Sequence, residues 1–167
     1  EASSSAVGSS PSPAQLRTAV QTAVLTHLRE RAEPAPYIVL HAAALQKLEK
    51  EGLLVAADRK QLTSRLAEVQ TSLSTVFQMD NGPLRRLDAA APVIEGGLWW
   101  LSDPPTPEGE PLSDQIEREV IRALSGGQPW TLPALHAALA PRFGGLFSPS
   151  DEWLTACLES YAAPAPQ

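Results

Sequence analysis

The sequence predicts a mainly α-helical protein with one short β-hairpin, built as two small modules in tandem. Three observations carry this prediction. Three stretches with apolar residues at helical spacing occupy the first half of the chain, and a segment with two adjacent tryptophans follows them. Three more helical stretches come after a proline-rich linker.

Composition sets the class of protein. A chain of 167 residues with 43% hydrophobic residues is long enough for one medium or two small cores. Cys157 is the single cysteine, which excludes an internal disulfide framework and a cysteine-based metal cage and predicts a reducing compartment. Since the chain has no run of eighteen apolar residues and no signal pattern at Glu1, we expect a cytoplasmic piece of a larger protein, with no membrane contact.

Proline and serine content divides the chain into five segments. A serine-rich tail expected to be disordered covers residues 1–13, because it cannot bury enough apolar surface to offset the entropy of ordering. The first module covers residues 14–102, and a proline-rich linker covers residues 103–111. A second, acidic module is expected over residues 112–161, with a short tail at residues 162–167.

The first two helices of the first module are expected at residues 14–32 and 38–51. Both stretches place apolar residues on one face and leave charged residues for water. Pro34 and Pro36 end the first helix and indicate a turn, because proline donates no backbone hydrogen bond. Gly52 stands where a left-handed residue is expected after the second helix.

The third helix is expected to begin after Asp58, whose side chain can cap it. Residues at spacings of three and four predict its buried seam. The members of this seam are Leu62, Leu66, Val69, Leu73, Val76 and Phe77.

A β-ribbon is expected from Leu84 to Leu101. Asp80 to Pro83 break the helical pattern before it, and Gly96-Gly97 supply the conformational freedom that a turn into a strand needs. Trp99 and Trp100 must point to opposite faces of a strand, so we expect one in the core and one at the surface as a site for a partner protein. Three helices followed by a two-stranded ribbon is the order of a winged helix-turn-helix, whose third helix is usually the one in a DNA groove.

The second module repeats the helical part of this order. Its first helix is expected at residues 112–124 with Ser113 as a possible cap, and Trp130 to Leu132 are expected to be a short extended segment. A second helix is expected to begin at Pro133, and a third, capped by Ser148 or Ser150, to end at Tyr161. No room remains for a wing, so this helix-turn-helix-like module is expected to be wingless or truncated.

Charge is distributed unevenly. Residues 1–100 hold ten Lys/Arg and ten Asp/Glu, whereas residues 101–167 hold three arginines and nine acids and so carry the whole net charge of −6. The second module is therefore a poor candidate for duplex contact. In the first module we expect five cations to lie on one side and grip phosphates: Arg59, Lys60, Arg65, Arg85 and Arg86. A mixed, solvated surface is the alternative, since Asp58, Glu68 and Asp88 stand among them.

Two longer stretches resemble a known group of proteins. Gly96-Gly97-Leu98-Trp99-Trp100-Leu101-Ser102-Asp103-Pro104, and the second half from Leu112 to Tyr161, are similar to accessory helical regions of bacterial DNA methylase-like proteins. This resemblance implies a DNA-recognition or protein-docking appendage whose chemistry lies elsewhere in a larger protein or complex. The catalytic motif of the methylases is absent, since Asp103-Pro104-Pro105 is followed by Thr106.

No pattern for catalysis is found in the chain. His27, His41 and His136 fall on apolar helix faces without metal-ligand spacing, and Asp114, Glu117 and Glu119 fit a solvated helix start. We therefore expect a non-enzymatic protein with no metal and no cofactor. Two functions stay open: a module that binds double-stranded DNA, or a protein-interaction module that assembles a larger complex without touching nucleic acid.

Overall fold

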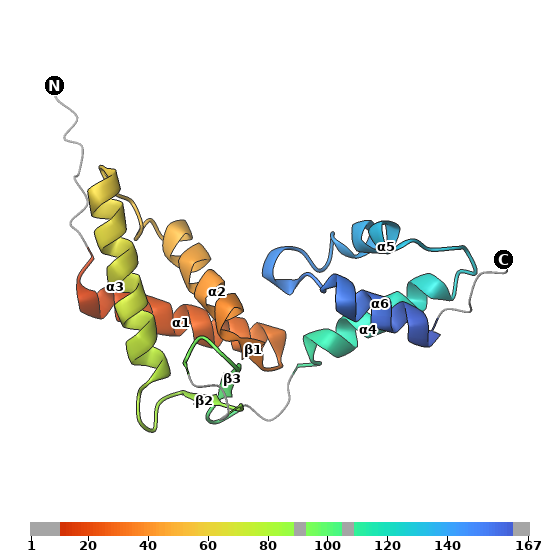
Figure 1. Ribbon diagram of the computed structural model, residues 1–167, viewed down its shortest axis with the longest axis horizontal. Coiled ribbons are helices and arrows are strands. Elements are labelled where there is room, and N and C mark those ends of the chain that lie inside the picture. The colour runs from red at the N-terminus through yellow and green to blue at the C-terminus, as the bar shows by residue number, and fades with distance from the viewer. Residues whose placement is uncertain (1–10, 89–92, 105–108, 162–167) are drawn as a thin grey trace. The chain divides into compact units, whose positions relative to one another are not determined.

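The structure is a computed structural model that describes residues 11–88, 93–104 and 109–161 (Figure 1). Six α-helices, three short strands and one 3₁₀ turn are formed in these ranges. The chain divides into two compact units. The first unit contains the chain up to Leu28 together with Ala35–Asp103, and the second contains Arg29–Pro34 and the chain from Pro104 onwards.

Three helices form the body of the first unit: α1 (Pro13–Arg31), α2 (Tyr37–Lys50) and α3 (Arg59–Phe77). The first two begin and end within one residue of the bounds expected from apolar spacing. Gly52 has a φ of 71° just after α2, the left-handed conformation that glycine adopts without strain. The largest fully buried side chains of the helices are Leu16, Val20, Val24, Leu28, Leu40, Leu48, Val69, Leu73 and Val76.

The seam predicted for α3 is only partly correct. The last four members of the seam, Val69, Leu73, Val76 and Phe77, are buried. Leu62 and Leu66 are 39% and 41% exposed. Spacing along a helix predicts which residues share a face, but not how far the neighbouring helices extend over that face. The first two turns of α3 therefore present leucines to solvent.

The start of α3 is held by the expected cap. Asp58 Oδ1 accepts a hydrogen bond from the backbone N–H of Gln61 at 2.8 Å, and Gln61 Oε1 accepts from the backbone N–H of Ala57 at 2.6 Å. The first bond satisfies a donor that the first turn of the helix leaves without a partner, and the second holds the residue before the cap.

We expect Asp58→Ala to lower the free energy of unfolding of the first unit by about 1 kcal/mol, because the N–H of Gln61 loses its acceptor. Asp58→Asn is the matched control, since asparagine caps helices equally well. Urea denaturation followed by circular dichroism measures both changes. Equal losses in the two variants would mean that the charge of Asp58, and not its capping hydrogen bond, supports the helix.

A small antiparallel sheet completes the first unit. Its strands are β1 (Ala35–Pro36), β2 (Leu84–Arg86) and β3 (Leu98–Leu101), in the order β1-β3-β2. The predicted hairpin is confirmed, because Leu84 pairs with Leu101 and Arg86 with Trp99. The strand β1 was expected to be a turn. Two residues, one of them a proline, are too few to show alternation, so no sequence pattern indicates that they pair with β3.

The adjacent tryptophans point to opposite faces, as expected. Trp99 is 4% exposed and its ring meets Phe77 edge-on at a centroid distance of 4.7 Å. Phe77 in turn packs against Tyr37 at 5.0 Å, so one aromatic cluster joins β3, α3 and α2. The indole N–H of Trp99 donates to the backbone oxygen of Ile94 at 3.1 Å, which satisfies its polar atom. Trp100 is half-buried.

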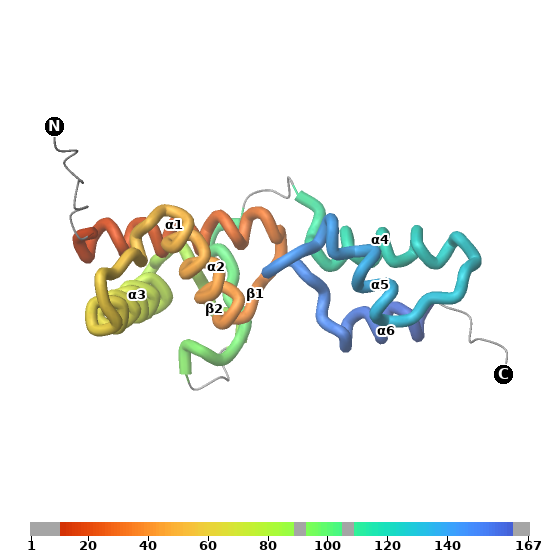
Figure 2. Tube along the Cα trace, turned by 90° about the horizontal axis from the view of Figure 1, so that it is seen from above, coloured from red at the N-terminus to blue at the C-terminus, as the bar shows by residue number. Residues whose placement is uncertain are grey.

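The second unit consists of α4 (Leu112–Leu124), α5 (Leu132–Leu139), the 3₁₀ turn η1 (Gly145–Phe147) and α6 (Asp151–Tyr161), shown as a tube in Figure 2. Thr131 caps α5 by accepting from the N–H of Ala134, and Ser150 accepts from the N–H of Trp153 in α6. The core that these helices enclose consists of Leu112, Ile116, Val120, Leu135, Leu139, Phe143, Leu154 and Cys157.

One local prediction for the second unit is wrong and another is partly right. Ser113 is not the cap of α4, because the helix already begins at Leu112 and Pro111 precedes it without a side-chain hydrogen bond. In the segment from Trp130 to Leu132 the backbone of Thr131 is extended, as expected, but Leu132 is already helical and no strand forms. The indole N–H of Trp130 instead donates to the backbone oxygen of Ala123 at 3.1 Å, which fastens this segment to the end of α4.

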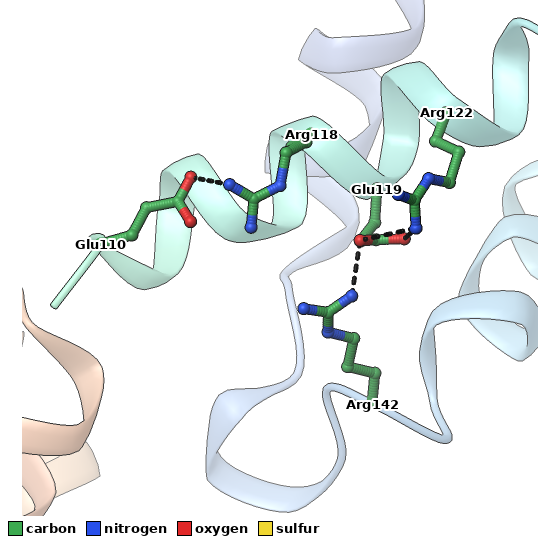
Figure 3. Close-up of polar contacts among 5 residues, drawn as sticks. All are labelled: Glu110, Arg118, Glu119, Arg122 and Arg142. Atoms are coloured by element: carbon green, nitrogen blue, oxygen red, sulfur yellow. Dashed lines mark hydrogen bonds and ion pairs between the residues drawn. The ribbon is translucent and has the colours of Figure 1, made fainter.

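The acids of α4 are more than a solvated helix start. Glu119 is paired with Arg122 at 3.3 Å on the same helix and with Arg142 at 2.5 Å after α5 (Figure 3). Its side chain is only 15% exposed. Glu117 accepts a hydrogen bond from the hydroxyl of Tyr161 at the end of α6, an interaction that raises the pKa of that tyrosine. These carboxylates therefore connect α4 to the rest of its own unit.

Candidate functional site

The cations expected to grip phosphates do not form one cluster. Arg59 and Lys60 lie in the first turn of α3 and are exposed, whereas Arg85 and Arg86 lie on β2, which follows the last turn (Figure 1). At 1.5 Å per residue, the 19 residues of α3 separate the two pairs by about 27 Å. The two pairs therefore lie near opposite ends of α3, and their common side stays a prediction.

Two of the five cations are engaged in the fold itself. Arg65 is 6% exposed, on the side of α3 that carries the buried seam. Arg86 donates from Nε to the backbone oxygen of Asp88 at 2.7 Å and from Nη1 to that of Val93 at 3.2 Å. These two hydrogen bonds connect Arg86 of β2 to the backbone between β2 and β3. The cations left on the surface are Arg59, Lys60 and Arg85, and none of them forms an ion pair within the described residues.

The register of the sheet defines a second candidate surface. Residues directly opposite in an antiparallel pair lie on the same face, and Arg85 lies opposite Trp100 while Pro36 lies opposite Leu98. Since alternate residues of β3 share a face, Leu98 and Trp100 belong together. We call the set Pro36, Arg85, Leu98 and Trp100 the outer sheet face.

The outer sheet face is apolar and open to solvent. Leu98 is 44% exposed, Pro36 and Arg85 are exposed, and Trp100 is half-buried. Of the two tryptophans expected to bind a partner, Trp99 lies in the core and only Trp100 remains available. Sequence reasoning missed Pro36 and Leu98, because their place follows from the register of β1 against β3. Tryptophan and arginine are the residue types that most often dominate the binding energy of protein interfaces.

The histidines occupy structural positions. His27 is buried in α1, and the ring of His41 packs on that of Tyr37 at a centroid distance of 5.8 Å. His136 Nε2 lies 2.6 Å from Asp151 Oδ1 and joins α5 to α6. In the ranges that the structure describes, no group of three or more His, Cys, Asp or Glu is arranged to hold a metal ion.

Two buried groups have shifted acidities. Burial raises the pKa of the Tyr37 hydroxyl, while the hydrogen bond from Gln70 at 3.3 Å lowers it and the charge of Glu95 raises it further. Burial also raises the pKa of the Cys157 thiol, with a smaller contribution from Glu117. A raised thiol pKa keeps the sulfur protonated and slow to react, as expected for a small core side chain.

Among the described residues, no helix is both long enough and apolar enough to cross a bilayer. Comparison with models of protein families, with curated proteins and with solved structures finds no match to this chain.

Proposed function

We propose that the first unit is a winged-helix module and that the chain is a non-enzymatic protein-interaction element of a larger DNA-processing, methylase-like assembly. The order α1, β1, α2, α3, β2, β3, with β3 in the middle of the sheet, supports the winged-helix assignment. The resemblance of residues 96–104 and 112–161 to accessory regions of methylase-like proteins supports the kind of assembly. The acidic second unit would then dock a partner of its own.

The outer sheet face carries this proposal. Trp100 offers a large, rigid ring with part of its surface free, and Arg85 lies directly across the ladder from it. Leu98 adds apolar surface that the first unit leaves uncovered. Such a combination gains more from contact with an apolar protein surface than from contact with a phosphate backbone, which would use the single cation only.

Site-directed crosslinking tests this function. A photo-reactive amino acid at Leu98 is expected to yield one defined adduct in a lysate of the cells that make the protein, identified by mass spectrometry. The same amino acid at exposed Thr18 on α1 is the positional control. We expect Trp100→Ser to reduce the Leu98 adduct about tenfold and Trp100→Phe to retain most of it, because the ring supplies the contact. An unchanged adduct in Trp100→Ser would refute the role of this face.

Binding of double-stranded DNA is the second candidate, favoured by the three surface cations Arg59, Lys60 and Arg85. If all three contact phosphates, the logarithm of the affinity falls with the logarithm of salt concentration with a slope of about −3. Replacing all three with glutamine removes that binding. A duplex titration with this slope and this loss would favour DNA over protein as the ligand, and no binding at low salt would exclude DNA.

A further inference from the structure

The turn between α3 and β2 contains the single asparagine of the chain, Asn81, which is followed directly by Gly82 (Figure 1). The backbone N–H of Gly82 donates to the backbone oxygen of Met79 at 3.0 Å and closes a four-residue turn. Asn81 stands at the third position of this turn with a φ of 54°, and its side chain is exposed. The one asparagine therefore lies open to water in a tight turn.

The turn favours these two residue types. The left-handed φ at its third position is adopted most readily by glycine, asparagine and aspartate. Gly82 is needed for space, because a Cβ atom there would lie 2.8 Å from the backbone oxygen of Met79 and 2.9 Å from its Cβ. The fold thus selects an asparagine followed by a glycine, a pair in which no side chain hinders access to the backbone nitrogen after the asparagine.

We propose that Asn81 is a site of spontaneous deamidation and that the hairpin of β2 and β3 controls its rate. Asparagine is among the thermolabile residues of proteins. The backbone nitrogen of Gly82 loses its proton and attacks Cγ of Asn81. The bond between these two atoms forms, the bond from Cγ to the side-chain nitrogen breaks, and ammonia leaves with the proton.

Water completes the reaction. It opens the resulting succinimide ring at either carbonyl, adding a hydroxyl group to the carbon and a hydrogen to the ring nitrogen. Opening at one carbonyl gives aspartate, and opening at the other gives isoaspartate, in which the main chain runs through Cβ. The only reactant besides the chain itself is water, to which Asn81 is exposed.

Hydrogen bonds around Gly82 oppose the attack. Its N–H is held by the oxygen of Met79, so the nitrogen reacts only when this bond opens. The backbone oxygen of Gly82 accepts from the hydroxyl of Ser102 at 2.7 Å, and that of Pro83 accepts from the N–H of Ser102 at 2.9 Å. Ser102 follows β3 directly, so the closed hairpin holds the turn. Local opening of the turn then sets the rate, without unfolding of the whole unit.

The two products affect the hairpin differently. Aspartate tolerates the left-handed conformation and retains the turn, while it adds one negative charge to the net charge of −6. Isoaspartate lengthens the main chain by one carbon just before β2, which moves Gly82 and Pro83 away from Ser102. The hairpin that pairs Arg85 with Trp100 is then looser. Only the consequence for binding at the outer sheet face rests on the proposed function.

Timed incubation of the full chain in mildly alkaline buffer tests the site. Intact mass spectrometry detects the replacement of NH₂ by OH, ion exchange detects the added charge, and peptide mapping separates aspartate from isoaspartate. Asn81→Gly is the control, because glycine accepts the positive φ and has no side chain to react. We expect the original chain to convert and this variant to stay unchanged.

Variants of Ser102 test the control by the hairpin. Ser102→Ala removes the hydroxyl that donates to Gly82, and Ser102→Thr is the matched control that keeps a hydroxyl. We expect Ser102→Ala to convert severalfold faster than the original chain, and Ser102→Thr to convert at the original rate. A synthetic peptide of residues 76–86, which has no hairpin, is expected to convert about tenfold faster than the folded chain. Circular dichroism checks that the variants keep the fold.

Two kinds of result would overturn the inference. Absence of conversion at Asn81 in both the original chain and Ser102→Ala, under conditions that convert the peptide fully, would refute the site. Equal rates in Ser102→Ala and Ser102→Thr, or in the folded chain and the peptide, would refute control by the hairpin. Because these measurements need no partner protein, their failure and a failure of the proposed function at Trp100 are told apart.

Discussion

Trp99→Ala is expected to destabilise the first unit by about 3–5 kcal/mol, a loss comparable to the whole stability of a small domain. The indole is 4% exposed and packs edge-on against Phe77, so its removal leaves a cavity between β3 and α3. It also leaves the backbone oxygen of Ile94 without its donor. Urea denaturation followed by nuclear magnetic resonance of assigned amides measures the change for each unit separately.

Trp100→Ala is the matched control for this variant. The two residues are neighbours of identical type on one strand, but Trp100 is half-buried on the opposite face. We expect it to cost about 1 kcal/mol, within the range usual for partly exposed sites. Amides of the second unit should keep their original transition in both variants. Similar losses for Trp99→Ala and Trp100→Ala would contradict the assignment of the two faces.

Leu154→Ala is expected to destabilise the second unit by about 2–5 kcal/mol. Leu154 is fully buried on α6, and the core around it is small. A unit of this size buries too little apolar surface to tolerate such a cavity well. Cys157, one turn away on α6, reports the result, because its buried thiol has a raised pKa and reacts slowly in the folded state.

We therefore expect alkylation of Cys157 to become markedly faster in Leu154→Ala, as measured by mass spectrometry after timed exposure to iodoacetamide. Ile121→Ala removes a side chain that is 40% exposed on α4 and should leave the alkylation rate close to that of the original protein. Rapid alkylation before any substitution would show that the thiol is open to solvent in the native fold.

Sequence patterns predict the helices of the first unit well and the packing between its elements less well. Apolar spacing located α1 and α2 within one residue, and the parity of a strand predicted that Trp99 and Trp100 face opposite ways. The buried one, Trp99, packs against Phe77. This contact joins segments that are distant in sequence, so no local pattern predicts it. The partial exposure of Leu62 has the same origin, since it depends on how closely α2 packs against α3.

The candidate site was predicted less well than the fold. Residue type alone predicts that Arg59, Lys60 and Arg85 lie on the surface. The same reasoning fails for Arg65, whose side chain is buried in the first unit. The outer sheet face can be identified only from the pairing of Pro36 with Leu98. The sequence does not predict this pairing, because β1 has only two residues. Both gaps concern tertiary contacts, which outweigh local preference wherever the two differ.

The aromatic cluster of Tyr37, Phe77 and Trp99 decides where this chain tolerates shortening. Its members come from α2, α3 and β3, so the last ring arrives only when nearly the entire first unit has been made. A shortened polypeptide that stops ahead of Leu98 leaves the other two rings uncovered and prone to aggregate. One that stops after Asp103 keeps all three rings and removes the second unit except for Arg29–Pro34.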